Sequence, residues 1–115
     1  MTYNGSCHCG AVTFTLDADI AGAMTCNCSR CHRLGWTLAF VPAGQFVLQT
    51  GADNLTEYRF NKKQIAHLFC KTCGIESFGR GQGPDGSETI AVNLRCLEGI
   101  DLKNLPTTEY DGKNA

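Results

Sequence analysis

The sequence lacks a long apolar run, a block of like charge and a recognisable signal peptide. No apolar segment approaches the roughly 20 residues that a membrane-spanning helix needs, so we expect no membrane partner. The longest basic run is Lys62-Lys63 and the formal net charge is −1. A nucleic-acid-binding face needs clustered lysine and arginine side chains, so we expect no nucleic-acid partner either.

The amino terminus has neither the charged start nor the apolar stretch of a secreted protein, which predicts a cytoplasmic location. The length of 115 residues supports one domain, which we place at residues 1–110, with a loose tail at 111–115. A domain of this size has a thin core, so an additional cross-link would stabilise it.

Eight cysteines are present, and their grouping favours metal binding over a disulfide framework. They occur as Cys7-x-Cys9, Cys26-x-Cys28-x-x-Cys31 and Cys70-x-x-Cys73, with Cys96 alone. Pairs this close would close almost no loop as disulfides, and disulfides are typical of oxidising compartments. The same spacing suits two or three thiolates that bind one ion.

Alternating apolar residues and frequent turn residues predict a mainly β protein. The expected strands are residues 11–16, 36–41, 45–49, 55–60, 64–69 and 88–94. The glycine-rich stretch 79–86 is expected to be a loop. A short helical turn is expected at residues 102–105, and no long helical period is present.

The first metal site is expected to combine two cysteine pairs from distant parts of the chain. Cys70-Lys71-Thr72-Cys73-Gly74 has the form of a zinc knuckle, whose glycine lets backbone N–H groups approach the sulfurs. Cys7 and Cys9, also followed by a glycine, are the natural complement. A structural zinc on these four thiolates would couple metal binding to folding.

The second site is expected to consist of Cys26, Cys28 and Cys31, which lack a complementary pair. Candidates for the fourth position are water, a substrate and four side chains, namely His8, His32, His67 and Cys96. His32 directly follows Cys31, so chelation by both would be strained, and Cys96 is more readily interpreted as a buried, inert thiol. Spacing therefore favours an open metal position, where chemistry can occur and where occupancy can be partial.

Four motifs in this order resemble the glutathione-dependent formaldehyde-activating family, whose domain is shared with centromere protein V. They are Gly5-Ser6-Cys7-His8-Cys9-Gly10-Ala11-Val12, Cys26-Asn27-Cys28-Ser29-Arg30-Cys31, His67-Leu68-Phe69-Cys70-Lys71-Thr72-Cys73-Gly74 and Val92-Asn93-Leu94-Arg95-Cys96-Leu97-Glu98-Gly99. The resemblance implies a small, zinc-stapled, mainly β domain of packed antiparallel sheets, a β-tent fold. It also implies a structural zinc on Cys7, Cys9, Cys70 and Cys73, and a second zinc on Cys26, Cys28 and Cys31.

The resemblance also implies a carbon–sulfur lyase-like activity, formation of S-(hydroxymethyl)glutathione from glutathione and formaldehyde. At a three-thiolate zinc, a substrate thiol suits the fourth position because soft ligands favour one another. Arg30 and Arg33 could offset the negative charge, and His32 could carry a proton. Trp36, Asn93 and Arg95 are candidates for contacts with the substrate.

Two functions of other classes remain open. One is a zinc-binding interaction module without catalysis. A basic extension would favour this function, and this sequence has none. The other is a redox or metal sensor, in which oxidation of Cys26, Cys28 and Cys31 expels zinc.

Overall fold

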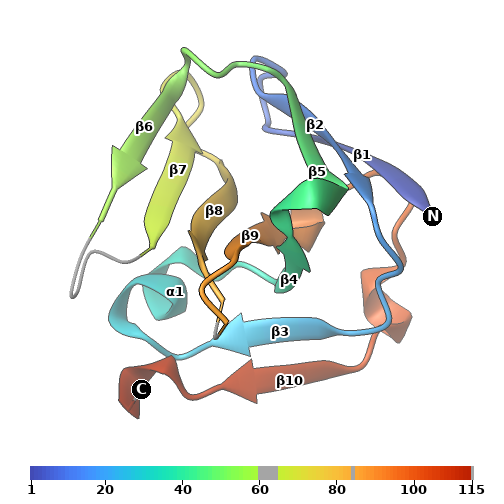
Figure 1. Cartoon of the computed structure of the whole chain (residues 1–115), viewed down its shortest axis with the longest axis vertical. Helices are drawn as coiled ribbons and strands as arrows, with labels where there is room; N and C mark the ends of the chain where they lie inside the picture. The colour runs from blue at the N-terminus through green and yellow to red at the C-terminus, as the bar shows by residue number, and fades with distance from the viewer. Residues whose placement is uncertain (60–64, 84, 115) are drawn as a thin grey trace.

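The computed structural model describes residues 1–59, 65–83 and 85–114, and within these ranges the chain is mainly β (Figure 1). The strands are β1 (Thr2–Ser6), β2 (Thr13–Asp17), β3 (Ala23–Cys26), β4 (Leu38–Pro42), β5 (Phe46–Thr50), β6 (Leu55–Tyr58), β7 (Ala66–Cys70), β8 (Glu76–Gln82), β9 (Glu88–Asn93) and β10 (Thr107–Tyr110). The helices are α1 (Ser29–Leu34) and the short 3₁₀ turns η1 (Ala43–Gln45), η2 (Leu94–Cys96), η3 (Leu102–Asn104) and η4 (Gly112–Asn114).

These strands form two sheets, which confirms the expected fold class. The smaller sheet has the order β1-β2-β5, and the larger has the order β10-β3-β4-β9-β8-β7-β6. All pairings are antiparallel except β10 with β3, which run parallel, so the larger sheet is mixed rather than wholly antiparallel.

The core lies between the two sheets and is built from the apolar faces that the alternation predicted. In β2, Phe14 and Leu16 are at most 1% exposed. The ring of Phe14 stacks on Phe46 of β5 at a centroid distance of 5.0 Å, and Phe46 contacts Phe78 of β8 at 4.7 Å. Burying side chains of this size contributes about 1.5–3 kcal/mol each, so these rings hold the sheets together.

A second, smaller core cluster lies beside α1. It consists of Cys31, Trp36, Leu38 and Ala91, all less than 9% exposed. Trp36 also lies near the imidazole of His67, at a centroid distance of 6.3 Å. This cluster anchors the inner side of a helix that has only six residues and could not be stable alone.

The glycine-rich stretch was expected to be a loop, and that prediction was wrong for Gly79 to Gln82, which belong to β8. A Cβ on Gly79 would lie 3.1 Å from the carbonyl oxygen of Ala66 on β7, so the glycine allows the two strands to approach closely. Pro84, in the same stretch, lies outside the described residues.

The other predicted elements are present with shifted ends. Strands begin at Thr13, Leu38 and Phe46 rather than at 11, 36 and 45. Residue 60 and residue 64, the outer ends of two further expected strands, lie outside the described residues. The helical turn expected at 102–105 is η3. The strands β1, β3, β8 and β10 and the helix α1 had not been predicted.

The carboxyl-terminal residues 111–114 contact the segment before α1. The side chain of Asn27 donates from Nδ2 to Asp111 Oδ1 at 2.9 Å, and its Oδ1 accepts from the Lys113 N–H at 2.9 Å. In the described parts of the chain, no helix is long and apolar enough to span a bilayer.

Candidate metal centres

Four cysteines from the two sheets meet at the first candidate centre. Cys7 and Cys9 follow β1 of the smaller sheet, whereas Cys70 ends β7 of the larger sheet and Cys73 lies in the turn before β8. Their sulfurs all lie within 4.8 Å of one another. The Cys7 and Cys9 sulfurs are 3.7 Å apart, and those of Cys9 and Cys70 are 3.6 Å apart.

Local backbone geometry presents these sulfurs as expected. Gly10 and Gly74, each directly after a cysteine of the cluster, have φ angles of 84° and 81°, which are accessible to glycine. Burial raises the pKa of Cys73, but hydrogen bonds from the backbone N–H groups of Ile75 and Cys9 lower it to about 6. Backbone N–H groups of this kind stabilise thiolates, the form that binds a metal.

The four sulfurs fit a tetrahedral ion. Four ligands at the usual zinc–sulfur distance of 2.3 Å would be about 3.8 Å apart. The distances of 3.6 and 3.7 Å are close to this value and far too long for disulfide bonds. All eight cysteines are free thiols, in agreement with metal binding rather than a disulfide framework.

Three cysteines form the second candidate centre. Cys26 ends β3, Cys28 is the N-cap residue of α1 and Cys31 lies in its first turn, so the segment that carries them is partly helical. Their sulfurs also lie within 4.8 Å of one another. The Cys28 sulfur accepts a hydrogen bond from the Cys31 N–H at 3.3 Å, which caps the helix and fixes the thiol at the same time.

The three thiols differ in their electrostatic surroundings. Burial raises the pKa of Cys26 and, more strongly, that of Cys31. Burial acts on Cys28 in the same direction, but the Cys31 N–H and the neighbouring thiols leave the pKa of Cys28 below its ordinary value. The Trp36 side chain offsets part of this rise in the pKa of Cys31. The indole N–H of Trp36 is buried and has no hydrogen-bond partner of regular geometry.

No fourth protein ligand joins these three sulfurs within the described ranges 1–59, 65–83 and 85–114. His8 and His32 are exposed, and His67 is bound to Glu76 at 3.0 Å. Cys96 is half-buried, and its pKa, raised mainly by burial, also responds to Cys7 and Cys73 of the other cluster. Among the described residues, this centre thus offers three ligands and the first offers four.

An open pocket of about 490 Å³ lies beside α1. Two of its lining residues lie between Cys28 and Cys31 in the sequence. It is lined by Ser29, Arg30, Arg33, Leu34 and Tyr58. The guanidinium of Arg30 lies 4.8 Å from the centre of the Tyr58 ring, and Arg33 donates to the Ser29 carbonyl at 2.8 Å. The structure thus brings together two of the predicted arginines at one pocket.

The remaining candidates lie in different surroundings. Trp36 is 4% exposed and packs in the core with Cys31. The buried side chain of Asn93 donates to the Glu76 carbonyl at 3.0 Å and accepts from the Arg95 N–H at 3.1 Å. Arg95 itself is exposed.

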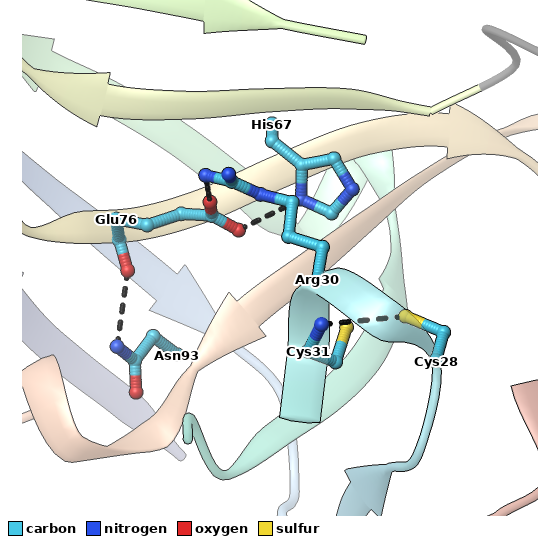
Figure 2. A network of polar contacts seen from close by, with 6 residues as sticks. All are labelled: Cys28, Arg30, Cys31, His67, Glu76 and Asn93. Carbon is cyan, nitrogen blue, oxygen red and sulfur yellow. Dashed lines mark hydrogen bonds and ion pairs between the residues drawn. The ribbon is translucent and has the colours of Figure 1, made fainter. Parts of the chain in front are cut away.

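Sequence reasoning missed a buried carboxylate, Glu76, which lies at the centre of a polar network (Figure 2). It is 1% exposed, and Arg30 and His67 contact its two oxygens at 2.6 and 3.0 Å. One signal was available, because Glu76 is the lone acid between the knuckle glycine and the apolar Phe78.

Comparisons with known proteins cover nearly the whole chain. Residues 2–110 match a family model described as "Glutathione-dependent formaldehyde-activating enzyme". Among solved structures, a crystal structure of a Rhodobacter sphaeroides protein is similar, with 37% sequence identity and a TM-score of 0.76. That similarity covers 94% of this chain and 100% of the other.

Proposed function

The chain belongs to the glutathione-dependent formaldehyde-activating enzyme family, and on this premise we propose that it is a zinc-dependent carbon–sulfur lyase-like enzyme. Its substrate would be a small thiol adduct such as S-(hydroxymethyl)glutathione. The observation that carries the proposal is the contrast between the two clusters, four sulfurs in one and three in the other. A four-thiolate zinc has no free position, whereas a three-thiolate zinc can take a substrate.

Cys26, Cys28 and Cys31 would hold the reactive zinc, and the other four cysteines a structural one. Bound at the three thiolates, zinc supplies a positive charge that lowers the pKa of a substrate thiol. In the forward direction a carbon–sulfur bond forms between this thiol and formaldehyde, and the thiol proton ends on the former carbonyl oxygen. In the reverse direction the same bond breaks and the proton returns to sulfur.

The charged residues of α1 have complementary roles in this proposal. Three thiolates and a substrate thiolate around a dication carry a net charge of −2, which nearby cations offset. Arg33 is exposed at the pocket beside α1 and is suited to a carboxylate of the thiol substrate. His32, exposed on the same helix, is the candidate proton carrier.

Exchange measurements by nuclear magnetic resonance test the proposal directly. Glutathione and formaldehyde also form their adduct without a catalyst, and the zinc-loaded protein is expected to accelerate this exchange in both directions. Cys28→Ser removes one of three metal ligands and is expected to abolish the acceleration. Cys96→Ser is the matched control, because Cys96 lies outside both clusters, and it should leave the acceleration unchanged. Equal exchange rates with and without the wild-type protein would contradict the proposal.

A further inference from the structure

Glu76 is a buried carboxyl group that contacts polar side chains from two different elements. Its Oε1 accepts from Arg30 Nη2 of α1 at 2.6 Å, and its Oε2 lies 3.0 Å from His67 Nδ1 of β7 (Figure 2). The carboxylate is 1% exposed, and the Arg30 side chain is 23% exposed. Because a buried charge without its partner is strongly unfavourable, Arg30 and Glu76 hold each other in place.

The positions of these residues in the sequence connect the two clusters. Arg30 lies between Cys28 and Cys31 of the three-cysteine cluster. The hairpin β7–β8 contains Glu76 and His67. It also carries Cys70 and Cys73 of the four-cysteine cluster. One ion pair therefore joins the helix that carries one cluster to the hairpin that carries the other.

The helix α1 depends on contacts of this kind for its position. It has six residues, packs mainly against β3, and buries Cys31. Arg30 adds a second anchor on another side, where its guanidinium lies between Glu76 and the ring of Tyr58. The backbone N–H groups of Arg30 and Cys31 both interact with the Cys28 sulfur, so a displaced Arg30 would also displace groups around a metal ligand.

We propose that Glu76 is a positioning residue that couples the two metal centres through Arg30. A metal ion at Cys7, Cys9, Cys70 and Cys73 fixes the β7–β8 turn and with it Glu76 and His67. Glu76 then fixes Arg30, which places Cys28 and Cys31 for the second ion. The four-cysteine cluster offers one more ligand and is filled first, and its metal raises the affinity of the other. This coupling does not depend on the proposed lyase activity.

The test is a metal titration of the full-length protein. Apoprotein is titrated with Co²⁺ in competition with a chromophoric chelator, which yields one dissociation constant for each cluster. The Cys28→Ser protein, which retains the four-cysteine cluster, identifies the constant and the thiolate–cobalt absorption bands of that cluster. Glu76→Gln keeps the shape of the side chain and removes its charge.

For Glu76→Gln we expect the dissociation constant of the three-cysteine cluster to rise about tenfold, the lower end of the usual effect of residues that support metal ligands. The constant and absorption bands of the four-cysteine cluster should stay unchanged. Glu88→Gln is the matched control, because it breaks the exposed Arg80–Glu88 ion pair of 2.7 Å that joins β8 and β9. It should change neither constant.

A second variant keeps the test valid if Glu76→Gln does not fold. Arg30→Lys retains the positive charge but lacks the planar guanidinium that contacts both Glu76 and Tyr58. It should weaken the three-cysteine cluster selectively, as Glu76→Gln does. The proposal is overturned if the folded variant leaves both constants at their wild-type values, or if it weakens both clusters equally, since that would indicate a general loss of stability.

Discussion

At the scale of single residues, the second cluster is shaped by a glycine far away in the sequence. A Cβ on Gly112 would lie 2.6 Å from the Cys26 sulfur and 3.3 Å from the Cys28 Cβ, closer than packed atoms tolerate. Asn27 forms hydrogen bonds with Asp111 and Lys113, the residues on either side of Gly112, and so holds them in place. Gly112 thus limits the space around the Cys26 sulfur and the Cys28 Cβ. The division between a domain at 1–110 and a loose tail stays a prediction.

Gly112→Ala should consequently disturb the three-cysteine cluster and leave the other intact. The added methyl group must displace either the Cys26 sulfur or residues 111–114, so we expect metal content to fall toward one ion per chain. Elemental analysis of the purified protein measures this content. Gly44→Ala is the matched control, because a Cβ there would have no atom within 4 Å. Equal metal content in both variants would show that the close approach has no consequence.

At the scale of secondary-structure elements, the hairpin of β7 and β8 contributes both to the four-cysteine cluster and to the polar network of Glu76. It supplies Cys70 and Cys73 to the four-cysteine cluster, and it places Glu76 at the start of β8. The partner cysteines, Cys7 and Cys9, follow β1 of the other sheet. A metal ion at this cluster therefore ties the two sheets together.

Cys70→Ser is expected to unfold the domain. Structural zinc of this type contributes about 10–16 kcal/mol when it binds, which is similar to the whole stability of about 5–15 kcal/mol of an ordinary domain. Loss of one thiolate leaves an open, mismatched site, so metal and fold should be lost together. Thermal melting followed by circular dichroism, with the metal content of the same sample, checks this. Native melting temperature together with full metal content would contradict the ligand assignment.

Elements with a regular pattern could be predicted from the sequence, and those that depend on tertiary contacts could not. The strands β2 and β5 have the alternation of one buried face, whereas β9 is buried on both faces from Ile90 to Asn93. The helix α1 has too few residues for a helical period and depends on Cys31, Trp36 and the Glu76 ion pair. The strand β8 contains Gly79 and Gly81, which indicate a turn in isolation but allow close packing within a sheet.

The candidate site was also predicted only in part, because local spacing reveals groups of cysteines but not contacts between distant segments. Ligand sets follow from spacing, because two cysteines separated by one or two residues can reach one ion, and both clusters formed as expected. Glu76 and Gly112 act through contacts between segments that are distant in sequence. The isolated acid before Phe78 is a weak local signal for Glu76, and Gly112 has none, so only the folded structure reveals the contacts of both residues.

At the scale of the whole molecule, the central feature is the unequal pair of clusters. One joins the two sheets with four sulfurs, and the other lies where β3 meets α1, near the carboxyl terminus (Figure 1). The Arg30–Glu76 ion pair connects them through the interior. Under the proposed function, the four-cysteine cluster is a closed centre that stabilises the fold, and the three-cysteine cluster is an open centre that takes a thiol.

Calorimetry of thiol binding tests this account most directly. Zinc-loaded wild type and Cys28→Ser are titrated with glutathione near neutral pH in buffers of different ionisation enthalpy, which counts the protons released. The wild type should release about one proton per thiol bound, because a free thiol becomes a metal-bound thiolate. The Cys28→Ser protein should show no such release, while its melting temperature falls only slightly. Equal binding and proton release by both proteins, or unfolding of Cys28→Ser, would contradict the account.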